Sequence, residues 1–506
     1  MAISRMTTPQ ATRSGGLLLS SPYEGVALLA DPIHRYILFT VPMGNRSERT
    51  EKEIIDNPWV QRLRRIHQLQ STWWVYPSGE HSRFQHVLGT MHMAGTFARH
   101  LYPSLKQTFG ETLPSEPFIE ELLRLAGLLH DVGHGPFGHF FDDHFLQQFS
   151  VAGERLNHEI LGMAIITKKL GKTIQAIRRS PSGPFRSDER LDPSQVAFLI
   201  KKPEAGSQRL GQRRASNLSG IRSAADVPNW LSALRSLFSG IYTVDNLDYV
   251  QRDAYMTGFS LDMVDIERLL LYTFFTPQGL TLHKAGESAL MRFLNAKIAL
   301  YVNVYHHRTT RAIDLHIQEI FKETMARIAP YHPHKALNRY LELTDWFLLE
   351  RVREWTTSKD SGERALGTEW GKILGRNVKW KMAYDFVSTI EESQRMVQFQ
   401  TATHLEETIR RHLPKRLCGI EFKVDMAALD PRPINPLAEG SKQIFMYNPT
   451  TGEVSPRPLM ELFRDIPPKV ARYRVFTTDR RHVKALSEAS EKALTGSAGE
   501  SIPTNI

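Results

Sequence analysis

The chain contains a single cysteine, Cys418, among its 506 residues. An internal disulfide needs two thiols, so a fold stapled by disulfides is excluded. Any metal ion must rely on histidine and carboxylate ligands, because a cysteine-based site needs several thiolates. A low cysteine content is also typical of reducing compartments, and we therefore expect a cytoplasmic protein.

Long apolar runs are also lacking. No stretch reaches the roughly 18 apolar residues that a membrane-spanning helix needs. The apolar patch nearest the N-terminus, Leu17–Ser20, is too short for the core of a signal peptide. The sequence therefore predicts no membrane span and no membrane partner.

The composition is that of a soluble globular protein, with 41% hydrophobic and 23% charged residues. The net charge is +10. Such a charge is compatible with simple solubility, and equally with attraction to a polyanion such as a nucleotide or nucleic acid. The arginine-rich run at 209–214 fits a solvated loop better than a nucleic-acid contact.

Apolar residues recur mainly at helical spacing, so we expect a mainly α fold with a small α+β C-terminal subdomain. The predicted division is a disordered tail at 1–20, a main domain at 25–330 with a basic insertion loop at 179–224, a helical extension at 331–415, the α+β subdomain at 416–485 and a second disordered tail at 486–506.

Several elements can be assigned along this division. We expect helices near 82–101, 118–130, 230–238 and 288–328, the last with a kink, a second polar cluster at 244–255, and a helical layer that includes 382–387. We expect strands at 35–39, 422–424, 444–447 and 472–476, with a hairpin turn at 448–452.

Ten of the 20 histidines fall between His67 and His158, which is under a fifth of the chain. The densest stretch runs from His130 to Asp142, where an apolar helix is expected to end in a glycine-rich loop. A core rarely tolerates several unpaired histidines, and a surface loop rarely needs them. This concentration predicts a metal-centred hydrolytic site.

A hydrolytic metal needs a few histidine and carboxylate ligands and an open position for water. His130 and Asp131 are adjacent at the predicted helix end, and His86 lies on another helix. One short loop cannot surround an ion, so a carboxylate from a distant segment is needed. Asp245 and Asp248 are the two candidates.

This arrangement resembles the H…HD…D signature of the HD-domain metal-dependent phosphohydrolases. The resemblance is closer to the deoxynucleoside triphosphate triphosphohydrolases, including the HD domain of the animal enzyme that also bears a sterile-alpha-motif. It is carried by DPIH at 31–34, QRLRRIHQL at 61–69, YPSG at 76–79, RFQH at 83–86, HDVGHGPFGHFFD at 130–142, and DY and RD at 248–253.

The resemblance implies a role for each matching position. His86, His130, Asp131 and Asp245 would hold the metal. The catalytic group would comprise His134, Asp142 and His158, which position and activate the nucleophile, and His139, which protonates the leaving oxygen. The substrate group would comprise Arg83 at a phosphate and Gln68, Leu69, Tyr249, Asp253 and Tyr305 around the deoxyribose and phosphates.

The resemblance further implies cleavage of a dNTP to a deoxynucleoside and inorganic triphosphate. The cofactor would be one divalent ion, with Mn, Fe, Co, Ni, Zn and Mg all compatible with these ligands, and further Mg can accompany the nucleotide. Asp56, Gln61 and Arg64 match positions that bind a regulatory nucleotide in the animal enzyme, although scaffolding is the simpler role. Relatives commonly form homo-oligomers.

Asn246 departs from the family pattern, because the animal enzyme has a lysine there. A phosphate contact is thereby lost, and Lys297 or the basic insertion at 201–214 could replace it. Two alternatives therefore stay open. One is an HD phosphohydrolase of a nucleoside monophosphate, a dinucleotide or a nucleic-acid end. The other is a nucleotide-sensing or nucleic-acid-binding protein without turnover, against which the full set of catalytic residues argues.

Overall fold

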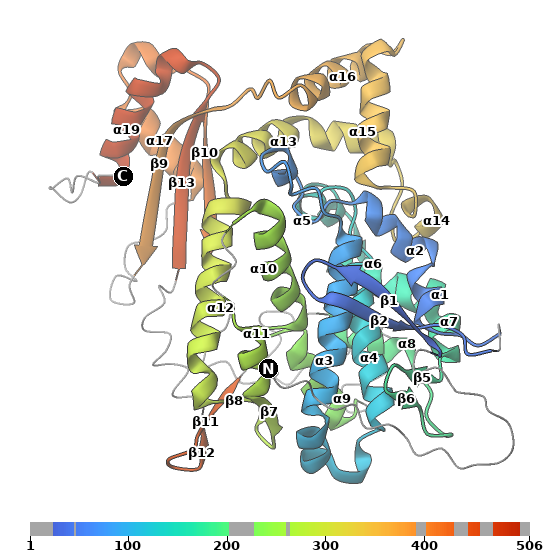
Figure 1. Ribbon diagram of the computed structural model, residues 1–506. Coiled ribbons are helices and arrows are strands. Elements are labelled where there is room, and N and C mark those ends of the chain that lie inside the picture. The colour runs from blue at the N-terminus through green and yellow to red at the C-terminus, as the bar shows by residue number, and fades with distance from the viewer. Residues whose placement is uncertain are drawn as a thin grey trace, which may run out of the picture.

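The computed structural model describes residues 24–44, 47–201, 227–259, 264–390, 401–429, 444–455 and 469–495. Helices dominate these residues, as the sequence predicts, and the sheets are small (Figure 1). No helix in the described ranges combines the length and the apolar character that crossing a bilayer requires.

A pair of long helices forms the centre of the main domain. Helix α3 (Arg83–Phe109) begins after Ser82, whose hydroxyl accepts the Gln85 backbone N–H. The Ser82 backbone N–H in turn donates to Oε1 of Gln85, which completes a capping box. Helix α4 (Glu116–Leu129) packs along α3, and twelve consecutive residues of α4 are buried. The apolar residues of both helices join one large core. The buried C-terminal end of α4 therefore delivers His130 into the interior.

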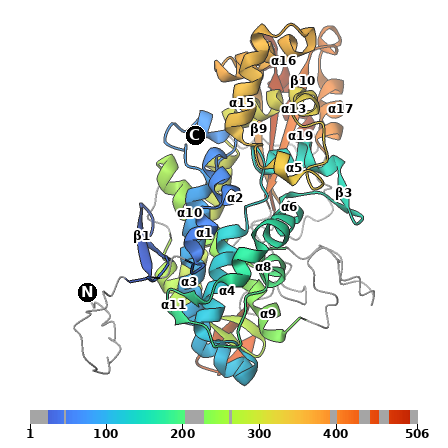
Figure 2. The same ribbon diagram turned by 90° about the vertical axis from the view of Figure 1, so that its right-hand side faces the viewer.

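The remaining helices lie beside this pair or toward one end of the molecule. They are α1 (Glu51–Ile55), α2 (Pro58–Gln61), α5 (His139–His144), α6 (His158–Ile165), α7 (Gly171–Ala176), α8 (Pro193–Ile200), α9 (Asn229–Leu234), α10 (Val244–Thr257), α11 (Ile266–Leu271), α12 (Glu287–Leu300), α13 (Arg308–Ile328), α14 (Leu337–Tyr340), α15 (Asp345–Glu354), α16 (Ser361–Leu374), α17 (Ala402–His412) and α19 (Val483–Thr495). Figures 1 and 2 place α15, α16 and the C-terminal sheet at one end of the molecule.

The strands form small antiparallel units. Strands β1 (Val26–Asp31) and β2 (Arg35–Thr40) make a hairpin, and β3 (Ser150–Val151) with β4 (Glu154–Arg155) and β5 (Arg179–Ser180) with β6 (Gly183–Pro184) make two shorter ones. A four-stranded sheet has the order β12 (Glu453–Ser455), β11 (Phe445–Asn448), β8 (Gly279–His283), β7 (Thr273–Thr276), in which only the β11–β8 pair is parallel.

The C-terminal α+β unit has its own sheet and core. Its strand order is β10 (Phe422–Leu429), β13 (Lys469–Thr477), β9 (Lys381–Ile390), all antiparallel. Helices α17 and α19 pack on this sheet through a separate apolar cluster. The helical prediction for 382–387 is wrong, because this segment is the edge strand β9. The predicted strand at 444–447 is present, but it pairs with β8 of the main domain.

Two predicted irregular segments are partly ordered. Within the predicted insertion at 179–224, residues 179–201 form β5, β6 and α8, and the arginine run lies outside the described residues. Within the predicted tail at 486–506, α19 continues to Thr495. Burial explains this extension, since Leu486 is 0% exposed and Ala489 only 2% exposed.

The predicted kink of the long helix is confirmed. Helix α12 runs into a π-helical turn, Tyr301–Tyr305, and α13 begins two residues later. The His307 side chain caps α13 by accepting the Thr309 backbone N–H. π-Helical turns are frequent at functional sites because they redirect side chains, and this turn provides one wall of the main pocket.

Candidate functional site

A pocket of about 530 Å³ lies between α3, α10, the π-helical turn and the loop after α4. It collects most of the predicted site residues in one place. Those that line it are Gln68, Leu69, Arg83, His86, His130, Asp131, His139, His158, Asp245, Tyr249, Asp253 and Tyr305. His134 and Asp142 stand directly behind this lining, in contact with Asp131 and His158 respectively.

The four predicted metal ligands converge although they come from three separate segments between His86 and Asp245. Nε2 of His86 lies 3.2 Å from Nε2 of His130 and 3.1 Å from Oδ1 of Asp245. Nε2 of His130 lies 3.3 Å from Oδ1 of Asp131 and 3.6 Å from Asp245. Two imidazole nitrogens and two carboxylates thus lie close together. Helix α10 brings Asp245 to the end of α4, where His130 and Asp131 lie.

The donor set fits a divalent cation. Ligand atoms bonded at about 2.0–2.2 Å from one ion are separated from each other by about 3–3.6 Å. Four of the separations found here lie in this range, and the His86–Asp131 separation is 4.0 Å. Two imidazoles and two carboxylates suit the first-row divalent metals and do not distinguish between them. His86, His130, Asp131 and Asp245 are therefore the residues that would hold the ion.

The electrostatics of the site also favour a positive charge. Burial works against the ionised forms, but the charges of His130 and Arg83 keep the pKa of Asp131 well below its ordinary value. Hydrogen bonds from His130 and His86 likewise depress the pKa of Asp245. Burial opposes protonation of His86, yet Asp245 and Asp248 raise the pKa of His86 to about 10. The carboxylates therefore attract a proton to a position where a cation would bind.

A second cluster of titratable groups adjoins the first. His158 Nδ1 contacts Asp142 Oδ2 at hydrogen-bonding distance, and the His134 ring stacks on the His158 ring with 3.8 Å between centroids. His134 Nε2 also lies 3.3 Å from Oδ1 of Asp131, which links the two clusters. The side chain of His139 is 58% exposed and opens toward the pocket. His139 is therefore the member of this cluster most accessible to a substrate.

The loop that carries these residues is held by its backbone. A Cβ atom on Gly133 would lie 2.0 Å from the carbonyl oxygen of His158, so only glycine allows this approach. The buried Arg62 donates to the carbonyls of Val132 and His134. The Tyr340 hydroxyl donates to the Gly133 carbonyl at 2.7 Å. Arg62 and Tyr340 fix the loop, and the sequence did not identify these roles.

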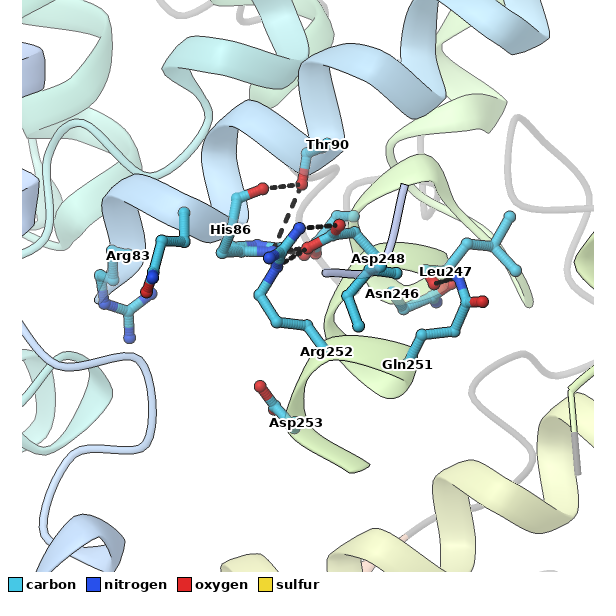
Figure 3. A network of polar contacts seen from close by, with 12 residues as sticks. Arg83, His86, Thr90, Asn246, Leu247, Asp248, Gln251, Arg252 and Asp253 are labelled. Atoms are coloured by element: carbon cyan, nitrogen blue, oxygen red, sulfur yellow. Dashed lines mark hydrogen bonds and ion pairs between the residues drawn. The ribbon is translucent and has the colours of Figure 1, made fainter. Parts of the chain in front are cut away.

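Asp248 has a different role from the one that its spacing suggested. It is fully buried, and its Oδ2 lies 2.8 Å from Nδ1 of His86, while its Oδ1 lies 2.7 Å from Nε2 of His34. Arg252 donates to both Asp248 oxygens (Figure 3). It also donates to Asp31. Asp248 therefore orients the ring of His86, and Asp245 is the carboxylate that faces the other ring nitrogen.

The predicted substrate residues form the rest of the pocket wall. Arg83 donates to Asp131 Oδ2 at 2.5 Å. The Tyr305 hydroxyl donates to Asp253 Oδ2 at 2.5 Å, and His81 contacts the other oxygen of Asp253 at 2.8 Å. Asp253 is therefore fixed from two sides, and the tyrosine–aspartate pair presents a polar edge to the pocket.

Asn246 serves the backbone of its own helix. Its Oδ1 accepts the Thr243 backbone N–H at 2.7 Å, and its own backbone N–H donates to the Thr243 hydroxyl. This reciprocal cap makes Asn246 a structural residue, although it lines the pocket. Lys297 also lines the pocket and supplies a cationic side chain there.

The three predicted regulatory residues make local contacts. Gln61 donates to the Ile55 carbonyl and accepts from Arg64, whose guanidinium stacks 3.7 Å above the Phe84 ring. Asp56 pairs with Lys52 one helical turn away. All these contacts are those of a scaffold, and the regulatory role stays a prediction.

Comparison with known proteins agrees with this geometry. The HD domain profile matches residues 83–227. The uncharacterized protein YwfO of Bacillus subtilis is 28% identical over 350 residues, which cover 65% of this chain and 66% of that protein. The deoxynucleoside triphosphate triphosphohydrolase SAMHD1 homolog of Dictyostelium discoideum is 24% identical over 370 residues, covering 71% of this chain and 61% of that protein.

The similarity to these two relatives thus spans less than two thirds of their own length. A crystal structure of a hypothetical protein from Aquifex aeolicus covers 92% of this chain and 99% of its own, with a TM-score of 0.62 and 20% identity. That likeness shows a shared fold. The HD profile, these relatives and the H…HD…D residues around the pocket agree: residues 83–227 match the HD domain, and the chain is similar to the deoxynucleoside triphosphate triphosphohydrolases.

Proposed function

We propose that this protein is a divalent-metal-dependent phosphohydrolase that cleaves dNTPs to deoxynucleoside and inorganic triphosphate. The observation that carries the proposal is the convergence of His86, His130, Asp131 and Asp245 at one pocket, with the His134–His158 stack directly beside them. A protein that only binds a nucleotide does not need this second cluster.

When bound, a divalent ion would supply Lewis acidity to a phosphoryl oxygen and lower the pKa of a water molecule. The side chains of the chain supply the remaining chemistry. Asp142 holds His158 through its Nδ1, and this pair faces the pocket beside His134. We assign these three residues to orienting the attacking water and accepting its proton.

The leaving group requires an acid. In the proposed reaction the water oxygen forms a bond to the α-phosphorus, the bond from phosphorus to the 5′ oxygen breaks, and the 5′ oxygen takes up a proton. His139 is the exposed histidine at the pocket, 3.9 Å from Oδ2 of Asp142. A histidine side chain is the commonest general acid in proteins, so we assign the proton donation to His139.

Two cationic side chains are suited to the phosphates. Arg83 reaches the pocket beside Asp131, where its planar guanidinium can bind two phosphate oxygens. Lys297 comes from α12, and we assign to it the phosphate contact that a lysine at position 246 would make. Asn246 itself is engaged in its helix cap. The Tyr305–Asp253 pair is placed to bind the 3′ hydroxyl of the sugar, and the ring of Tyr305 to crowd a 2′ hydroxyl.

Product analysis tests the proposal. The protein would be incubated with each dNTP, NTP and dNMP in the presence of Mn²⁺, Mg²⁺, Fe²⁺ or Co²⁺, and the products separated by ion-exchange chromatography. Equal amounts of deoxynucleoside and triphosphate from dNTPs support the proposal. Orthophosphate released only from monophosphates would replace it with a different HD phosphohydrolase activity.

A further inference from the structure

The C-terminal sheet has one apolar face and one charged face. Successive side chains of a strand point to opposite faces, and Tyr473 and Val475 of β13 join the apolar cluster beneath α17 and α19. The opposite face carries charged side chains, among them Arg472, Arg474, Asp385 and Asp425. Figure 1 shows the sheet beside α12 and α13. The charged face is therefore the one that can contact the main domain.

Two arginine–aspartate pairs belong to this charged face. Arg311 of α13, which lines the main pocket, donates to both oxygens of Asp425 on β10, at 2.6 and 3.0 Å. Arg472 of β13 donates to both oxygens of Asp385 on β9, at 2.8 and 2.5 Å. A planar guanidinium bound by two oxygens is held in direction as well as in position. The first pair ties α13 to the sheet, and the second fixes the direction of Arg472.

Arg472 also contacts the backbone of the π-helical turn. In a regular α-helix the His306 N–H would donate to the Val302 carbonyl, four residues earlier. Here the His306 N–H donates to the Tyr301 carbonyl, five residues earlier, at 2.9 Å. A backbone carbonyl that loses its helical partner needs another donor. Nη1 of Arg472 donates to the Val302 carbonyl oxygen at 3.3 Å, so the sheet supplies that donor.

The π-helical turn positions two tyrosines of the main pocket. Tyr301 and Tyr305 both line the pocket, and their rings meet edge to face with 5.0 Å between centroids. The Tyr305 hydroxyl donates to Asp253, the pair assigned above to the sugar. The place of the Tyr305 ring follows the path of the turn, and a displacement of about 1 Å in a site can change rates strongly. The contact between Arg472 and Val302 therefore bears on how the sugar fits.

We propose that Arg472, oriented by Asp385, is a positioning residue for sugar selection, which holds the π-helical turn so that Tyr305 excludes a 2′ hydroxyl. This inference rests on the proposed nucleotide substrate. Arg472 is not among the residues that line the pocket, and it acts through the Val302 carbonyl. The C-terminal sheet thereby supports the pocket from outside, and its two arginine–aspartate pairs hold the same wall at neighbouring points.

The kinetic test compares kcat/KM for each dNTP with that for the matching NTP. Arg472→Met removes the guanidinium but keeps an unbranched side chain, and should lower the dNTP/NTP ratio about 5- to 10-fold, the worth of one hydrogen bond. Asp385→Asn, a milder change, should lower it less. A loss of folded protein reduces both rates equally and leaves the ratio unchanged. Arg481→Met is the matched control, because Arg481 is 86% exposed and pairs with Asp479 in the same unit.

Hydrogen–deuterium exchange separates this inference from the proposed function, because it needs no substrate. Amides of residues 301–307 should exchange at least about 5-fold faster in Arg472→Met, from the loss of one hydrogen bond, and at the wild-type rate in Arg481→Met. Affinity for Mn²⁺ should stay the same in both, since no predicted metal ligand lies on the turn.

Faster exchange without any dNTP hydrolysis would refute the proposed substrate and support the role of Arg472 in holding the turn. Unchanged exchange in both Arg472→Met and Asp385→Asn would overturn the inference even in an active enzyme. An unchanged dNTP/NTP ratio in Arg472→Met would also overturn it.

Discussion

Nδ1 of His86 lies 2.8 Å from Oδ2 of Asp248. The other ring nitrogen, Nε2, faces the predicted metal position. The Asp248 carboxylate is 0% exposed and is itself bound by His34 and Arg252. A carboxylate behind a metal-binding histidine sets the tautomer and the direction of the ring. The hairpin turn at Asp31–Arg35 is thereby connected to the site through His34.

This relationship predicts that Asp248→Asn weakens metal binding without removing a ligand. The affinity should fall about 10- to 100-fold, the usual effect of losing such an outer carboxylate. Isothermal titration with Mn²⁺ measures the affinity. Circular dichroism checks that the variant is still folded, because the substitution removes the charge that pairs with the buried Arg252. His34→Gln, which removes one partner of Asp248, should show a smaller decrease. Unchanged affinity in both variants would contradict the positioning role.

Asp131→Ala should abolish both metal binding and turnover, since Asp131 faces His130 and also receives Arg83. Metal content after dialysis is measured by atomic emission, alongside dNTP hydrolysis. Asp143→Ala is the matched control, because Asp143 is an exposed aspartate in the same stretch. A metal-loaded and active Asp131→Ala protein would exclude Asp131 as a ligand.

His139→Ala should retain the metal but slow turnover at least about 100-fold, the typical contribution of a general acid. The loss should shrink for substrates whose leaving group needs no proton, such as a p-nitrophenyl ester of a deoxynucleotide. His144→Ala, five residues further along α5, should leave both quantities unchanged. If His139→Ala were fully active, another group would have to protonate the 5′ oxygen.

Glu121 predicts a pH dependence of stability outside the pocket. It is fully buried, neither of its carboxyl oxygens has a partner among the described residues, and burial together with Glu51 raises the pKa of Glu121 well above 4.5. A raised folded-state pKa means that its favourable contribution is complete below about pH 4.5 and is lost as the pH rises through the folded value.

Glu121→Gln should therefore become more stable relative to wild type as the pH rises from 5 to 8. The difference should grow by at most about 1.4 kcal/mol per pH unit. Urea unfolding at several pH values measures this difference in the free energy of unfolding. The test is its change with pH rather than its absolute value, because burying the amide of glutamine also costs free energy. A difference that stays constant with pH would mean that Glu121 is already ionised.

The sequence was most informative where one short motif carries several ligands. His130 and Asp131 are adjacent, and their helix end could be expected from the glycines that follow. Spacing alone could not decide between Asp245 and Asp248, because three residues apart both lie on one face of α10, and only the family resemblance pointed to Asp245. Only the fold shows that they meet opposite nitrogens of His86.

Strand β9 shows the same limit for the fold. Its residues were assigned to a helical layer, yet their partner β13 lies about 80 residues further along the chain. Pairing across such a distance overrides local preference.

The central claim is tested most directly by hydrolysis of a dNTP in H₂¹⁸O, with metal-loaded wild-type protein, chelator-treated protein and the Asp131→Ala variant. The account predicts that one ¹⁸O atom enters the inorganic triphosphate and none enters the deoxynucleoside, and that both controls are inactive. Label in orthophosphate or pyrophosphate, or turnover that survives chelation and Asp131→Ala, would contradict it.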